Sequence, residues 1–200
     1  MTQALMVGLA RLVSGARANW VGCAPDTRQR IYFANHTSHL DALVLWAVLP
    51  PAVRSLTRPV AARDYWSATW LRRRIAEDVF HAVLIERAKP TIRDNPLEGM
   101  LSAMGGRCSL IVFPEGSRGC GSEPADFKGG LFHLAKRRPD VELVPVLMDN
   151  LNRILPKGEF LPVPLLGGVS FGAPIRLEPN EEKTAFLIRA RQAVLSLRHL

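Results

Sequence analysis

Residues 30–41 read RIYFANHTSHLD, an apolar run that passes directly into a polar turn. The run 30–34 is typical of a buried strand, and the apolar residues 42–49 after the turn predict a helix. Ser38 and Asp41 have the spacing of a capping box, although Glu or Gln normally stands where Asp41 does. We therefore expect Ser38 at the N-cap of this helix and Asp41 in its first turn.

His36 lies just before this helix, and its position gives the turn a chemical character. Two residues five apart inside one helix lie about 140° apart around its axis, whereas a histidine outside the helix can fold back toward Asp41. A carboxylate that holds one imidazole nitrogen fixes the tautomer and leaves the other nitrogen free as a base. The pattern indicates a His–Asp pair with no nucleophile beside it. Taken alone, it is more typical of a histidine that hydrogen-bonds within a turn than of a catalytic base.

The composition is that of one globular domain, with 200 residues, 48% of them hydrophobic and 22% charged. Cys23, Cys108 and Cys120 are far apart and form no C-x-x-C, which favours neither a zinc ribbon nor a disulfide framework and suits a reducing cytoplasm. The net charge of +8 favours an anionic lipid surface or a phosphorylated substrate. Nucleic acid is disfavoured, because the sequence has no nucleic-acid-binding motif and no long basic run.

The first twenty residues contain no acidic residue, and Leu5, Leu9, Leu12 and Ala16 recur at helical spacing. The stretch is too short to span a bilayer, which takes about 20 apolar residues, and it lacks the basic start of a signal peptide. An amphipathic helix on a membrane surface fits this pattern, and a helix packed on the core fits it nearly as well. We expect residues 1–25 to be a membrane-associating segment that precedes one domain over residues 26–200.

The rest of the chain alternates between strand-like and helix-like segments. Strands are expected near 58–62, 79–85, 108–113, 144–147 and 169–175, and helices over 96–104, 131–138 and 181–197. The alternation predicts an α/β fold, with a mostly buried central sheet flanked by helices. Pro145 predicts an edge or bulge position for its strand. Aromatic residues next to three arginines in 65–74 suit a membrane interface or a phosphate ligand, or else a solvated helix face.

A second polar segment follows the apolar run 108–113 and reads PEGSRG over residues 114–119. Its glycines let the backbone approach a ligand, Ser117 supplies a hydroxyl, and Arg118 supplies a planar fork for phosphate. Arg87 closes another strand and could grip phosphate in the same way. Loops at the ends of buried strands are where α/β sheets usually keep their sites.

Four blocks of the sequence, in order, resemble the glycerophospholipid acyltransferase family, in particular its lysophosphatidic acid acyltransferases. Residues 35–41 look like the family's N-H-x-S-x-x-D motif, and residues 113–118 match its third motif closely. Residues 84–87 resemble the second motif, with Glu86 where the family usually has Asp, and residues 144–146 match the fourth.

The resemblance implies an acyltransferase that moves a fatty acyl group from acyl-CoA or acyl-carrier protein to the free hydroxyl of a lysophospholipid. The default acceptor is 1-acyl-sn-glycerol-3-phosphate, which would give phosphatidic acid. His36 would be the general base and Asp41 would orient it, with direct attack and no acyl-enzyme. The residues expected to bind the substrate are Arg87, Glu115, Gly116, Ser117 and Arg118. No cofactor or metal is implied, and the expected location is peripheral, on the cytoplasmic face of the membrane.

Two other kinds of function fit parts of the sequence. A metal-dependent hydrolase could use His36, His39 and Asp41 as ligands, but the remaining histidines have no paired spacing and residues 115–119 would be unexplained. A non-catalytic membrane-binding protein of the same fold would not require these polar residues. Within the family, the motifs do not distinguish lysophosphatidic acid from another acceptor such as a lyso-ornithine lipid, nor do they distinguish the two donors.

Overall fold

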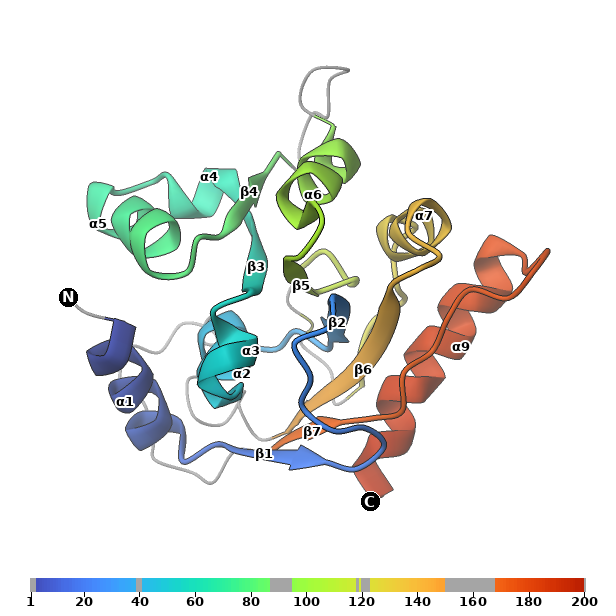
Figure 1. Cartoon of the computed structure of the whole chain (residues 1–200), viewed down its shortest axis with the longest axis horizontal. Helices are drawn as coiled ribbons and strands as arrows, with labels where there is room; N and C mark the ends of the chain where they lie inside the picture. The colour runs from blue at the N-terminus through green and yellow to red at the C-terminus, as the bar shows by residue number, and fades with distance from the viewer. Residues whose placement is uncertain are drawn as a thin grey trace.

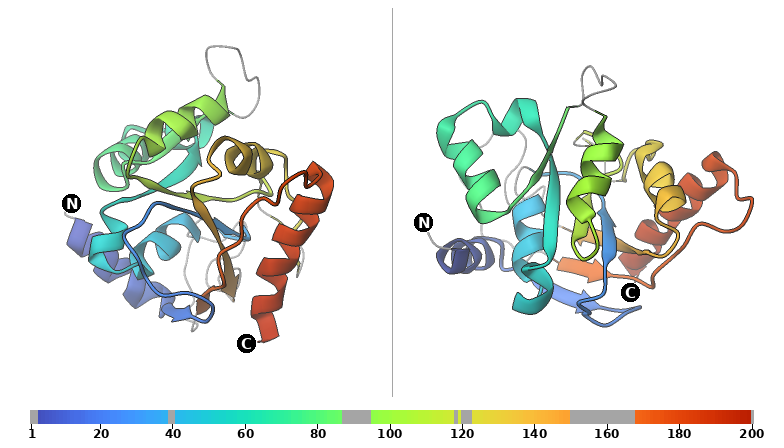
Figure 2. Two further views of the ribbon diagram at one scale, coloured as in Figure 1. Left: turned by 45° about the vertical axis from the view of Figure 1, so that its right-hand side comes forward. Right: turned by 45° about the horizontal axis from the view of Figure 1, so that its top comes forward.

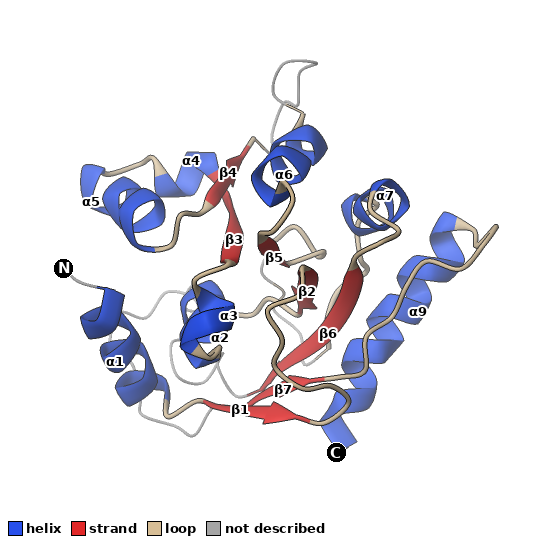
Figure 3. Cartoon of the chain, viewed as in Figure 1, coloured by secondary structure: helices blue, strands red, loops and turns tan. Residues whose placement is uncertain are grey.

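The structure, a computed structural model, describes residues 3–38, 41–86, 95–117, 119, 123–149 and 168–199. These residues form a seven-stranded sheet in the order β1-β7-β6-β2-β5-β3-β4, parallel except for the pair β6 and β7 (Figures 1 and 3). The strands are β1 (Arg17–Trp20), β2 (Arg30–Ala34), β3 (Thr57–Ala62), β4 (Val83–Ile85), β5 (Ser109–Val112), β6 (Glu142–Asp149) and β7 (Gly168–Phe171).

Helices pack on both faces of the sheet, so the predicted α/β class with a buried central sheet is confirmed (Figure 2). The helices on one side are α1 (Gln3–Ser14), α2 (Asp41–Val48) and α3 (Pro51–Arg54). Those on the other side are α6 (Pro96–Met104), α7 (Gly130–Arg137) and α9 (Lys183–Leu195), which continues as the 3-10 turn η2 (Ser196–His199). An arm beyond β3 consists of α4 (Arg63–Trp66), α5 (Trp70–Arg74) and the π-helical turn η1 (Ile75–Val79).

The central strand β2 shows why both faces of the sheet are covered by helices. All five of its residues are buried. Tyr32 and Ala34 belong to the core under α1 and α2, whereas Ile31 and Phe33 belong to the core under α6, α7 and α9. Because side chains alternate across a strand, a continuous apolar run can fill both cores at once. This strand leads straight into the turn that carries His36.

The N-terminal segment belongs to the same folded unit. The inner face of α1 buries Met6, Val7 and Ala10 in the core that also contains α2, and the Arg11 Nε donates to the carbonyl of Ala47 at 3.0 Å. The chain then adds β1 to the sheet beside β7, an element that the sequence did not predict. Leu5, on the outer face, is 60% exposed. None of the helices in the described parts of the chain combines the length and apolar character needed to cross a bilayer.

One expectation about strands is wrong, and the edge alternative for the Pro145 strand is excluded. Residues 79–85 are not one strand, because the chain ends η1 at Val79, bends at His81 with a φ of +48°, and forms only the short strand β4. The Pro145 strand is not an edge strand, since β6 lies between β7 and β2. Pro145 is tolerated there because of the direction in which its backbone points. Its carbonyl faces the β7 side and accepts from the Gly172 N–H at 2.9 Å, and the N–H that proline lacks would point to the same side. The ladder to β2 therefore loses no bond.

Candidate active site

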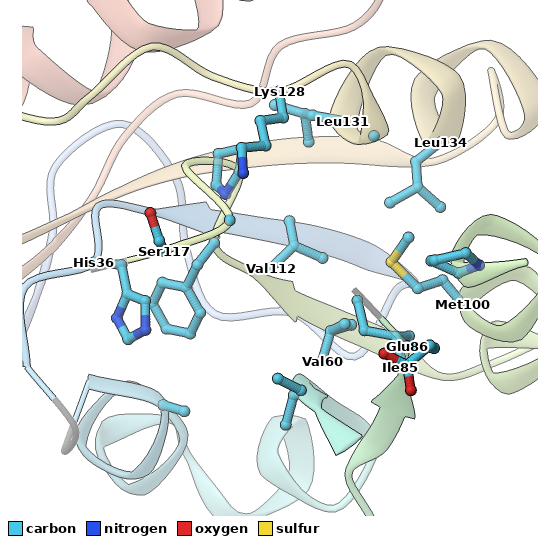
Figure 4. A pocket seen from close by; sticks show the side chains of 18 of the residues that line it. His36, Val60, Ile85, Glu86, Met100, Val112, Ser117, Lys128, Leu131 and Leu134 are labelled. Atoms are coloured by element: carbon cyan, nitrogen blue, oxygen red, sulfur yellow. The ribbon is translucent and has the colours of Figure 1, made fainter. Parts of the chain in front are cut away.

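A cavity of about 510 Å³ lies at one end of the sheet, next to the carboxyl ends of β2, β3, β4 and β5. Its polar end holds His36, Ser117 and Lys128, and its opposite end lies against β4 and α6 (Figure 4). Apolar side chains line most of the remainder, among them Val60, Ile85, Met100, Val112, Leu131 and Leu134. The position agrees with the general rule that parallel sheets bind ligands at the carboxyl ends of their strands.

His36 and Asp41 form the pair that the sequence predicted. The imidazole Nδ1 lies 2.8 Å from the Asp41 Oδ2, and this oxygen also accepts from the backbone N–H groups of Thr37 at 2.6 Å and Ser38 at 2.9 Å. Asp41 is fully buried in the first turn of α2, and its bond to the Ser38 N–H joins the two residues that have the spacing of a capping box. Because a carboxylate only accepts hydrogen bonds, Nδ1 carries the proton, and in the neutral imidazole Nε2 keeps a free lone pair. This is the arrangement of a general base.

The backbone of His36 is fastened to the loop after β5. The Glu115 carboxylate, only 3% exposed, accepts from the His36 N–H at 2.7 Å and from the Ala125 N–H at 2.9 Å. The Gly119 N–H in turn donates to the His36 carbonyl at 2.9 Å. Phe113 stacks on the imidazole, with ring centroids 4.4 Å apart. These contacts fix both the backbone and the ring plane of His36, and sequence reasoning did not assign them.

Gly116 is favoured by its backbone conformation, and the Lys128 side chain lies close over it. Its φ of +71° lies in the left-handed region, which costs other residues free energy. A Cβ at this position would lie 2.8 Å from the Lys128 Nζ, so the lysine side chain passes directly over the glycine. The Lys128 N–H also donates to the Pro114 carbonyl at 2.8 Å. Sequence reasoning gave Lys128 no role, and the Lys-Gly-Gly run of residues 128–130 was the only signal of a close approach.

The predicted site residues fall into three groups. His36, Gly116 and Ser117 line the cavity. Asp41 and Glu115 are buried behind its wall and support it through hydrogen bonds. The third group, Arg87, Arg118 and the alternative metal ligand His39, lies outside the described residues. Glu86, the departure in the second motif, lines the cavity beside Ile85. Within the described ranges, no three His, Cys, Asp or Glu side chains are grouped so that they could hold a metal ion.

Comparison with known proteins agrees with this geometry. The chain is 24% identical over 178 residues to the 1-acyl-sn-glycerol-3-phosphate acyltransferases of Limnanthes douglasii and Limnanthes alba, matching 86% of its own length but only 59% of theirs. The fold resembles the crystal structure of the 1-acyl-sn-glycerophosphate (LPA) acyltransferase PlsC from Thermotoga maritima. That match has a TM-score of 0.71 at 15% identity, covering 98% of this chain and 80% of that one. The Acyltransferase family model matches residues 23–149, which include the His36–Asp41 pair and the loop after β5. The chain therefore belongs to the acyltransferase family.

Proposed function

We propose that this protein transfers a fatty acyl group from acyl-CoA or acyl-carrier protein to the free hydroxyl of a lysophospholipid. The acceptor that fits best is 1-acyl-sn-glycerol-3-phosphate, so that the product is phosphatidic acid. The observation that carries the proposal is the contact between the His36 Nδ1 and the buried Asp41 Oδ2, at the polar end of a largely apolar cavity. The names of the similar plant enzymes and of the Thermotoga enzyme support the same acceptor.

In the proposed reaction, the His36 Nε2 takes the proton of the acceptor hydroxyl as its oxygen attacks the thioester carbonyl carbon. The tetrahedral intermediate then expels the thiolate, which takes the proton back from Nε2, so the imidazole ends as it began. The Asp41 carboxylate stabilises the imidazolium that exists between these steps. Both substrates must be bound together, and orienting them supplies roughly 7–11 kcal/mol of the barrier at best. The donor already carries an activated thioester, and the reaction needs no cofactor.

The apolar part of the cavity suits a fatty chain. Met100 and Leu134 lie at its far end, and Val112 and Leu131 lie between them and the loop that carries Ser117 (Figure 4). The volume of about 510 Å³ is that of a typical small-molecule pocket. Each methylene group buried there contributes about 0.8 kcal/mol to binding. A cavity with a base at one end and a mostly apolar remainder, in which Glu86 is the exception, favours a hydroxyl acceptor beside an acyl chain over a water-soluble substrate pair.

The acceptor and product are lipids, and we propose that the protein works peripherally on anionic lipid at the cytoplasmic face of a membrane. Trp70 is 76% exposed on α5, in the same arm that supplies Tyr65 and Trp66 to the cavity wall. Arg72 packs over the Tyr65 ring at 4.5 Å, so the arm combines aromatic and basic groups as interfacial segments do. Both α5 and α1, with its exposed Leu5, lie at the left of Figure 1.

Membrane binding is tested by co-sedimentation with vesicles that contain anionic lipid. Because α1 and β1 belong to the core and the sheet, deleting them would damage the fold, and point variants are the better probes. Trp70→Ser and Leu5→Ser should each weaken sedimentation. Ile188→Ser, which removes a 59% exposed apolar side chain from α9, serves as the matched control. Equal sedimentation of all three variants with the wild type would refute this surface.

The activity is tested by thiol release from acyl-CoA on liposomes, with a panel of lyso-acceptors and the His36→Ala variant in parallel. We expect release that requires both His36 and a phosphate-bearing lyso-acceptor. Release only with another acceptor, such as a lyso-ornithine lipid, would keep the mechanism and replace the acceptor. If no acceptor supports release, an acyl-carrier-protein donor is tried next, and continued inactivity with both donors would refute the proposed reaction.

A further inference from the structure

The cavity contains a cation that the predicted site did not include. We propose that the Lys128 ammonium binds the anionic head group of the acceptor and so determines the enzyme's preference for phosphate-bearing acceptors. The inference rests on the proposed function. Lys128 lines the cavity together with His36, Gly116 and Ser117, and its side chain reaches toward the loop that carries Ser117 (Figure 4).

The backbone of Lys128 is held in register with the catalytic base. Its N–H donates to the Pro114 carbonyl at 2.8 Å, within the loop that follows β5. The next residue of that loop, Glu115, binds the His36 N–H and the Ala125 N–H through its two carboxylate oxygens. Phe127, beside the lysine, is buried in the core under α7. One backbone hydrogen bond and two hydrogen bonds to the Glu115 carboxylate therefore connect the segment that carries the ammonium to the segment that carries the imidazole.

The side chain is free to take a ligand. In the described part of the chain, the Lys128 ammonium makes no hydrogen bond or ion pair, whereas several surface arginines there are paired with carboxylates. A cation at the polar end of a largely apolar cavity, without a partner among these residues, is placed to attract an anion. Among the lining residues that the structure describes, the one carboxylate, Glu86, lies at the β4 end of the cavity beside Ile85 (Figure 4). An anionic head group is therefore favoured at the Lys128 end, where the hydroxyl beside it comes near His36.

Gly116 allows this placement. A Cβ there would lie 2.8 Å from the Lys128 Nζ and 2.9 Å from its Cδ, so any larger residue would displace the ammonium. The left-handed φ of Gly116 and the passage of the lysine over it occur at the same point of the loop. The glycine of the third motif thus has two functions: it makes the turn and it leaves room for the cation.

The test compares Lys128→Met and Lys128→Arg with Lys183→Met. Lys183 is a matched control, because its side chain also packs over a glycine, Gly129, but does not line the cavity. Lys128→Met should raise the acceptor KM about tenfold or more, equivalent to about 1.4 kcal/mol. The donor KM should change less than about threefold. The KM for monoacylglycerol, an acceptor whose head group is uncharged, should also change less than about threefold. Lys128→Arg should recover much of the loss, and Lys183→Met should behave like the wild type.

Equilibrium binding of 1-acyl-glycerol-3-phosphate, measured by calorimetry on the same variants, separates this inference from the proposed function. Weaker binding by Lys128→Met in a protein with no turnover would sustain the cation site and refute the reaction. Normal turnover and unchanged binding by Lys128→Met would refute the cation site alone. A rise in the donor KM in place of the acceptor KM would also refute it, by moving the lysine to the phosphates of the donor. Because Lys128 is exposed, the variants should unfold within a few degrees of the wild type.

Discussion

Replacing Asp41 with Asn tests the mechanism most directly, because it removes a charge and little else. In the wild type, the Asp41 Oδ2 accepts from the His36 ring and from the N–H groups of Thr37 and Ser38. An asparagine whose oxygen takes this place keeps all three hydrogen bonds, so the first turn of α2 should survive. The lost negative charge no longer stabilises the imidazolium that forms as the acceptor is deprotonated. The variant should therefore fold but turn over slowly.

The expected loss can be worked from the geometry. Nδ1 and Oδ2 are 2.8 Å apart, which puts the centres of the two charges about 4 Å apart. At an effective dielectric constant of about 20, unit charges at this separation attract by about 4 kcal/mol. At about 1.36 kcal/mol per factor of ten, kcat should fall roughly a thousandfold. If the amide NH2 faces the ring instead, Nδ1 must accept, the proton moves to Nε2, and the loss is larger.

The assay is kcat at saturating donor and acceptor, together with thermal unfolding. Asp140→Asn is the matched control, because it makes the same chemical change at a 63% exposed side chain that pairs with Arg138 at 2.8 Å. The control should keep kcat within about twofold, since exposed ion pairs contribute about 1 kcal/mol or less to stability. A well-folded Asp41→Asn enzyme with kcat within tenfold of the wild type would show that the carboxylate charge does not support catalysis by His36.

Three further variants address other parts of the structure. Glu115→Gln turns an amide NH2 toward the N–H of either His36 or Ala125, and a buried donor left unpaired costs about 1–3 kcal/mol. The variant should therefore have a lower Tm in thermal unfolding and a lower kcat. An unchanged Tm would contradict the role of these two buried hydrogen bonds. Met100→Ala enlarges the far end of the cavity. The acyl-CoA with the highest kcat/KM should therefore have a longer chain in the variant than in the wild type. An unchanged chain-length preference would place the acyl chain elsewhere. Burial raises the pKa of Tyr32 to about 12 from 10. The unfolded chain therefore ionises first, and stability should fall as the pH rises from about 10 to 12, by at most about 1.4 kcal/mol per pH unit. Tyr32→Phe should remove this part of the loss of stability at alkaline pH, as measured by denaturant titrations. If the free energy of unfolding of the variant and of the wild type depended on pH in the same way, this role of Tyr32 would be refuted.

The parts of the fold that the sequence predicted are those whose cause is local. The segment 30–41 contains a buried strand, a turn and a helix start within twelve residues, and both the apolar run and the capping spacing can be read there directly. The contact between His36 and Asp41 joins residues only five apart, so its geometry follows from where the helix begins. Helix α6 was predicted for the same reason, with the Asn95 side chain accepting from the Leu97 N–H at its cap.

The wrong expectations concern segments whose state depends on neighbours distant in the sequence. Val79 and Phe80 are buried whether they end a helical turn or begin a strand, so an apolar run over 79–85 does not distinguish the two. Strand β1 has a half-exposed pattern and few strand-forming residues, and it exists because β7 offers an edge to pair with. Pro145 can lie inside the sheet because its missing N–H points away from β2, toward the segment just after β7, where its carbonyl still accepts from the Gly172 N–H.

The candidate site also contains residues that the sequence predicted and one that it did not, and this difference bears on how the acceptor head group is bound. Arg87 and Arg118 were predicted as phosphate ligands from residue type and position, whereas Lys128 acquires its place only through the close approach over Gly116. A phosphate monoester carries about 1.5 to 2 negative charges at neutral pH. One ammonium neutralises only part of that charge, so a head-group site built on Lys128 calls for at least one more cation, the role expected of the arginines. For this reason Lys128→Met should weaken acceptor binding about tenfold without abolishing it. Combining it with Arg118→Ala should weaken binding further, until the enzyme no longer distinguishes a phosphate-bearing acceptor from monoacylglycerol. A double variant that still prefers the phosphate would show that neither side chain reads the head group.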